Sequence, residues 1–91
     1  MLTGDDARFV PLLVRLEKPL AESGLSAADA AALVSYSLGN GSVWWADHAL
    51  DWVEQGVPSA DVKDALNRAV DDDRLPQPTR HRALRLAQRS N

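Results

Sequence analysis

Residues 42–56 read SVWWADHALDWVEQG, and this stretch decides the fold of the chain. Apolar residues recur in it with the period of an α-helix and form one stripe: Trp45, Ala49, Trp52 and Val53. Ser42 has a hydroxyl oxygen that can cap a helix N-terminus, and Gly56 tolerates the backbone of a helix end. We therefore predict an amphipathic helix over 43–55 that buries both tryptophans of this stripe together in a core.

The rest of the chain carries helix signals of the same kind. Ser26-Ala-Ala-Asp29 resembles a capping box, alanine is abundant, and no stretch alternates apolar and polar residues as a strand would. We predict four further helices, at about 5–22, 27–38, 60–71 and 79–89. The first should bend at Pro11 and Pro19, and a linker between Pro76 and Pro78 should precede the last. The expected fold is all-α, a compact four- to five-helix bundle that forms a single domain over 1–91.

Length and composition limit what the chain can be. It has 91 residues, 45% of them hydrophobic, which allows one modest core, and it has no cysteine for a disulfide or a thiolate metal site. Its N-terminus, MLTGDD, is acidic where a signal peptide is basic and apolar, and no apolar run approaches the roughly 20 residues of a membrane span. We expect a cytoplasmic protein with no membrane partner.

Charge is sorted along the chain. Residues 1–73 hold all 13 acidic side chains and five basic ones, a net charge of −8, whereas residues 74–91 hold five arginines and no acid. Asymmetry of this size indicates that electrostatics shape contacts inside the protein or with a partner. The run Asp71–Asp73 ends the predicted helix 60–71, where the helix dipole disfavours acids. We expect this run to lie past the helix or to be neutralised by a basic neighbour.

The helix 43–55 also has a polar side that includes a third tryptophan. At helical spacing Trp44 is surrounded by Asp47, His48 and Asp51, and Glu54 continues the acidic ridge one turn further. A large aromatic residue among charges is typical of a protein interface, where it packs against the partner. We predict that these five residues bind another protein of basic charge. The alternative is that the N-terminal segment folds over Trp44.

The last predicted helix carries a basic face made of Arg82, Arg85 and Arg89. These cations could bind the phosphates of a nucleic acid, contact an acidic protein, or neutralise the acidic residues of the same chain. The internal role is favoured because the body is so acidic, so a nucleic-acid-binding regulator is an alternative to the protein-binding prediction. A homodimer, in which the basic helix of one copy meets the acidic ridge of the other, also uses the asymmetry.

Signals of catalysis are absent from the sequence. It has no glycine-rich phosphate loop followed by lysine, no cysteine nucleophile and no serine in an elbow motif. His48 and Asp51 lie three residues apart, as two metal ligands on a helix would, but no third ligand is evident. We therefore predict that the protein is not an enzyme and uses no cofactor and no metal.

The order of features over residues 33–69 resembles a known class of small proteins. A helix leads to the break at residues 39–41, a helix with the rhythm Ala-Leu-x-x-Val over residues 49–53 follows, and a further helix is capped at Ser59. This is similar to the small all-helical immunity proteins with which bacteria neutralise polymorphic or contact-dependent toxins. The acid often found beside the glycine is Ser42 here, and the arginine-rich last helix is not typical. The resemblance implies that the protein inhibits a toxin. An acidic surface on the inhibitor fits a basic toxin such as a nuclease.

Overall fold

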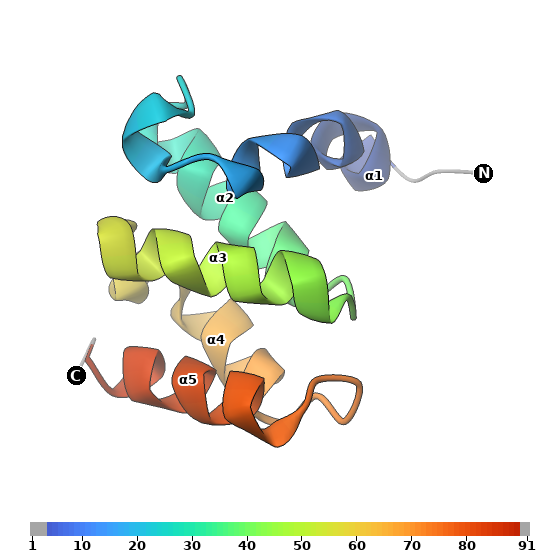
Figure 1. Ribbon diagram of the computed structural model, residues 1–91, viewed down its shortest axis with the longest axis vertical. Coiled ribbons are helices and arrows are strands. Elements are labelled where there is room, and N and C mark those ends of the chain that lie inside the picture. The colour runs from blue at the N-terminus through green and yellow to red at the C-terminus, as the bar shows by residue number, and fades with distance from the viewer. Residues whose placement is uncertain (1–3, 90–91) are drawn as a thin grey trace.

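Helix α3 (Val43–Gln55) crosses the middle of the molecule and contacts helices on three sides (Figure 1). The structure is a computed structural model that describes residues 4–89. Its other elements, in chain order, are α1 (Gly4–Phe9), η1 (Val10–Glu17), η2 (Leu20–Glu22), α2 (Ala27–Leu38), η3 (Ser59–Val62), α4 (Lys63–Val70) and α5 (Gln77–Gln88), where η denotes a 3₁₀-helix. All regular structure within residues 4–89 is helical. The predicted all-α, single-domain fold is confirmed.

Helices α2 and α3 have the predicted bounds because local signals set their ends. The hydroxyl oxygen of Ser26 accepts a hydrogen bond from the amide of Asp29 at 3.1 Å, and that of Ser42 accepts one from the amide of Trp45 at 3.4 Å. Gly56 follows α3 with φ at 144°, a backbone conformation that residues with a Cβ rarely adopt. These caps and stops explain why the two central helices could be located from sequence.

The N-terminal segment differs from the single bent helix predicted over 5–22. Only α1 is α-helical; η1 continues as a 3₁₀-helix with Pro11 in its first turn, and Pro19 separates it from η2. Proline has no amide hydrogen to donate, so Pro11 cannot extend the α-helical hydrogen bonding of α1. In η1 the side chains of Leu13 and Leu16 lie one above the other and both are buried.

The two C-terminal helices also differ slightly from their predicted bounds. The predicted helix 60–71 is divided into η3 and α4, and α5 begins at Gln77 rather than at 79. Pro78 belongs to the first turn of α5, where its missing N–H has no intrahelical partner to lose. The linker between Pro76 and Pro78 was therefore a wrong prediction.

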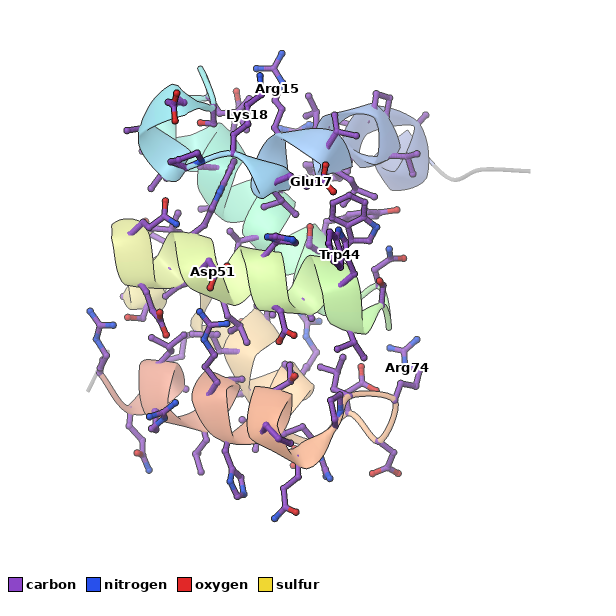
Figure 2. The ribbon with its side chains drawn as sticks, in the orientation of Figure 1. Arg15, Glu17, Lys18, Trp44, Asp51 and Arg74 are labelled. Carbon is purple, nitrogen blue, oxygen red and sulfur yellow. The ribbon has the colours of Figure 1, made fainter. Side chains whose placement is uncertain are left out.

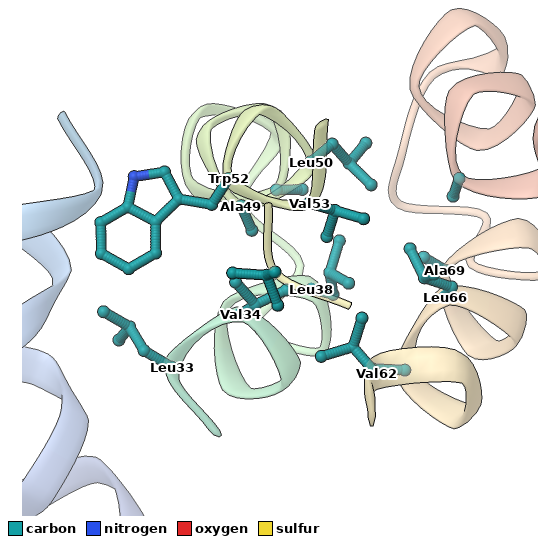
Figure 3. Close-up of a cluster of buried hydrophobic side chains, with 14 of the residues drawn as sticks. Leu33, Val34, Leu38, Ala49, Leu50, Trp52, Val53, Val62, Leu66 and Ala69 are labelled. Carbon is teal, nitrogen blue, oxygen red and sulfur yellow. The ribbon is translucent and has the colours of Figure 1, made fainter. Parts of the chain in front are cut away.

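The core lies where α2, α3 and α4 meet, and Trp52 is its largest fully buried side chain (Figure 3). The indole N–H of Trp52 donates to the backbone oxygen of Lys18 at 2.9 Å, so its one polar group has a partner. Trp45 is only partly buried, which corrects the prediction that the two would be buried together.

Within residues 4–89 no helix combines the length and the apolar character that crossing a bilayer requires.

Candidate functional site

Helices α3 and α5 run side by side in the same direction, and polar groups join them along their length (Figure 1). Near the N-terminal ends, the hydroxyl of Thr79 donates to the carboxylate of Asp47 at 2.9 Å. One turn further, the Nη1 of Arg82 donates to the backbone oxygen of Asp47 at 3.2 Å. Asp47, one of the predicted partner-binding residues, thus has both its side chain and its backbone oxygen engaged by α5.

The guanidinium of Arg82 lies between two more acids of α3. It donates through Nε to Glu54 at 3.0 Å and through Nη2 to Asp51, and only 20% of its side chain is exposed. The hydrogen bond from Arg82 lowers the pKa of Glu54 from its ordinary value of 4.5, against the opposing effect of burial. The same hydrogen bond, which Glu54 accepts, raises the pKa of Arg82. The pair of carboxylates on α3 is therefore neutralised in part from within the molecule.

The other two arginines of the predicted basic face stay on the surface. Arg85 and Arg89 are exposed, and with Arg82 and Leu86 they surround Glu54 in a surface hollow of about 290 Å³. Because α3 and α5 are parallel, the negative ends of both helix dipoles lie at the same end of the molecule, where these cations are favourable. Of the three arginines of the predicted basic face, Arg82 thus pairs with acids of the same chain, and Arg85 and Arg89 remain exposed.

Arg74, the first arginine of the C-terminal segment, also has partners in the molecule. Its guanidinium donates to the carboxylate of Asp72 at 2.9 Å and 3.0 Å and to the backbone oxygen of Gly39 at 3.3 Å. These hydrogen bonds from Arg74 lower the pKa of Asp72. The acidic run predicted at 71–73 follows α4, and Asp72 has a basic neighbour, so both expectations for it are confirmed. Gly41 has φ at 79°, and a Cβ there would lie 2.6 Å from the guanidinium of Arg74.

Trp44 lies on the opposite edge of α3 from α5 and is 59% exposed (Figure 2). Its indole N–H donates to the carboxylate of Glu17 in η1 at 3.2 Å, and its ring meets the ring of His48 edge-on with centroids 4.8 Å apart. The N-terminal segment therefore reaches Trp44 without covering it. His48 is half-buried, and its Nδ1 lies 3.8 Å from the carboxylate of Asp51.

A second exposed apolar side chain shares this surface. Val14 is 60% exposed, and it lies three residues before Glu17 in a helix with three residues per turn, so the two side chains share one column. Val14 and Trp44 are the two most exposed large apolar residues in the described part of the chain. We call the residues Val14, Glu17, Trp44, His48 and Asp51 the Trp44 surface.

Val14 and Glu17 were not among the site residues predicted from the sequence. Read with an α-helical period, Glu17 is simply one of several exposed acids of the N-terminal segment. The prolines at 11 and 19 were a usable signal that the predicted helix over 5–22 is interrupted, because the segment between them is too short for a regular α-helix of that length. Val14 and Glu17 lie three residues apart, so an α-helical and a 3₁₀ reading both place them on one face, and neither indicates that Trp44 lies beside Glu17.

The predicted ridge is thus divided between two environments. Asp47 and Glu54 face α5, Asp51 contacts both Arg82 and His48, and Trp44 and His48 face η1. Within residues 4–89 no three histidine, aspartate or glutamate side chains are grouped so that they could hold a metal ion. Comparison with protein-family models, with curated proteins and with solved structures finds no match to this chain.

Proposed function

We propose that this domain works by binding another protein, of basic charge, through the Trp44 surface. The observation that carries the proposal is that the two most exposed large apolar side chains of residues 7–89 both neighbour Glu17. Val14 lies one 3₁₀ turn before it, and the indole of Trp44 donates to its carboxylate. Apolar anchors beside charges that set orientation are the usual content of a protein interface. The indole of Trp44 is held by Glu17 and His48, so little side-chain freedom is lost when a partner binds.

Within this class, we favour an inhibitor of the immunity or antitoxin type whose target is a basic toxin protein. Two observations support this: the resemblance of residues 33–69 to small bacterial immunity proteins, and the net charge of −8 on residues 1–73. An acidic surface accelerates association with a basic protein and discriminates against acidic ones. An inhibitor of this type would act in the cytoplasm of the cell that makes the toxin.

The alternative, a nucleic-acid-binding regulator, has less support from the geometry. Its predicted basic face loses Arg82 to Asp51 and Glu54, which leaves only Arg85 and Arg89 of that face exposed. Each lost phosphate contact lowers affinity and flattens the salt dependence of binding. The homodimer alternative loses its acidic ridge in the same way, because the ridge already pairs with the basic helix of its own chain.

The test is to isolate the partner from native lysate and to measure its affinity by calorimetry for the wild type and for Trp44→Ala. We expect the variant to bind about 30-fold or more weakly, as truncation of a central aromatic anchor does, while its unfolding temperature stays close to that of the wild type. Leu84→Ala is the matched control, because Leu84 is 40% exposed but lies on α5. Unchanged affinity in Trp44→Ala would contradict the proposal.

A second measurement addresses the alternatives directly. Fluorescence anisotropy with duplex DNA near about 150 mM salt should detect no complex. Binding that is lost in Arg85→Ala would support the nucleic-acid-binding alternative instead. A dimer in sedimentation that Trp44→Ala leaves intact would support the homodimer.

A further inference from the structure

We infer that the partner contributes an arginine whose guanidinium lies on the indole of Trp44 and pairs with the carboxylate of Glu17. This inference rests on the proposed function and specifies the chemistry by which the Trp44 surface recognises its target. In this arrangement Glu17 of η1 is the acid that selects the partner, and the acids of the α3 ridge do not have that role.

Glu17 is the acid of this surface that is left without a cation. One of its oxygens accepts the indole N–H of Trp44 at 3.2 Å, and among the described residues no basic side chain forms an ion pair with it. Asp51 and Glu54, by contrast, already share Arg82. A cation from a partner therefore gains more at Glu17 than on the ridge, where it would compete with Arg82.

The indole beside Glu17 offers a place for the same cation. A tryptophan that is 59% exposed has at least one ring face in solvent, since its edges alone do not provide that much surface. The electron-rich face of an indole attracts a cation within about 6 Å of the ring centre. The hydrogen bond to Glu17 and the edge-on contact with His48 fix the ring next to the carboxylate, so both attractions act on one ligand group.

Arginine fits this arrangement better than lysine does. Its planar guanidinium can stack on an indole and donate in the same plane to a carboxylate, and it gives up its hydration more readily than an ammonium group. The exposed Val14 lies in the same column of η1 as Glu17 and offers an apolar contact for the methylene stem of the side chain.

The experiment is an NMR titration of the ¹⁵N-labelled protein with N-acetylarginine amide at constant ionic strength. The chain has three tryptophans, so three indole N–H signals serve as reporters, and Trp44→Phe assigns the one that belongs to Trp44. We expect the Trp44 signal to shift saturably, with an apparent Kd on the order of 100 mM for this single contact. The signals of Trp45 and the buried Trp52 should stay in place.

Three comparisons decide the outcome. Glu17→Gln should reduce the affinity about threefold or more, while Glu22→Gln, which alters another exposed acid of the N-terminal segment, should leave it unchanged. The neutral citrulline analogue should cause no saturable shift, and N-acetyllysine amide should bind more weakly than the arginine probe. A lysine probe that binds as well as arginine, or a Glu17→Gln variant that binds normally, would overturn the inference.

These outcomes are separable from the fate of the proposed function. If Trp44→Ala abolishes partner binding but the arginine probe does not bind, the Trp44 surface is an interface of other chemistry. If the probe binds as expected but Trp44→Ala has no effect on partner affinity, the proposed function fails while the cation site remains.

Discussion

Replacing Arg82 with methionine removes the guanidinium between α3 and α5 and keeps the apolar stem of the side chain. The guanidinium has three acceptors on α3: the carboxylates of Asp51 and Glu54 and the backbone oxygen of Asp47. Surface ion pairs contribute up to about 1 kcal/mol each, and these two carboxylates are half-exposed, so full charge–charge energies do not apply. With the hydrogen bond to Asp47 included, we expect a loss of roughly 1.5–2.5 kcal/mol in the free energy of unfolding.

A loss of this size lowers the unfolding temperature of a domain of about 90 residues by roughly 10 °C. Circular dichroism melting at neutral pH measures it directly, and the all-helical fold gives a strong signal. Arg85→Met is the matched control, because Arg85 lies one turn further along α5 and is exposed. The control should change the free energy of unfolding by less than about 0.5 kcal/mol.

The pH dependence provides an independent check of the Arg82 contacts. Because the hydrogen bond from Arg82 lowers the folded-state pKa of Glu54, this contribution is fully present above the ordinary value of 4.5. It is lost as pH falls through the lowered folded-state value, where Glu54 is protonated. The difference between wild type and Arg82→Met should therefore shrink in acid. Equal melting of the Arg82→Met and Arg85→Met variants at neutral pH, or a difference that persists at about pH 2, would refute the assignment.

Two further comparisons test other parts of the fold. Trp52→Ala should cost about 3–5 kcal/mol in the free energy of unfolding, because it empties a fully buried site, whereas Trp45→Ala should cost clearly less; chemical denaturation measures both. Gly41→Ala should destabilise by more than about 1 kcal/mol, because its φ is positive and its Cβ would clash with Arg74. Gly39→Ala, with a negative φ and only ordinary van der Waals contacts for a Cβ, should be near neutral by the same assay.

Local signals account for the part of the fold that could be predicted from the sequence. The ends of α2 and α3 follow from Ser26, Ser42 and the glycines after each helix, which act through their own backbone neighbourhood. The burial of Trp52 follows from the apolar stripe of its helix. Trp45 belongs to the same stripe but is only partly buried, because burial also depends on which segments pack over the helix, and no periodicity encodes that.

The candidate site depends on tertiary arrangement and was therefore only partly predictable. The acidic ridge and the basic face were both visible in the sequence, but whether they meet depends on α5 lying parallel to α3 rather than elsewhere. The pairing of Arg82 with Asp51 and Glu54 is a consequence of that direction. Glu17 was missed because its importance comes from Trp44, a residue that is 27 positions away in the chain.

The packing of α5 against α3 explains part of the charge asymmetry along the chain. Arg74 and Arg82 hold the C-terminal segment against the acidic body, one at the turn around Gly41 and the other along α3. Arg82 neutralises acids on the side of α3 that faces α5, whereas Glu17, on the side that faces η1, has no such partner within the described residues. Under the proposed function, Arg82 thus acts inside the molecule, and Glu17 beside Trp44 is the acid of the Trp44 surface that is open to a cation of the partner.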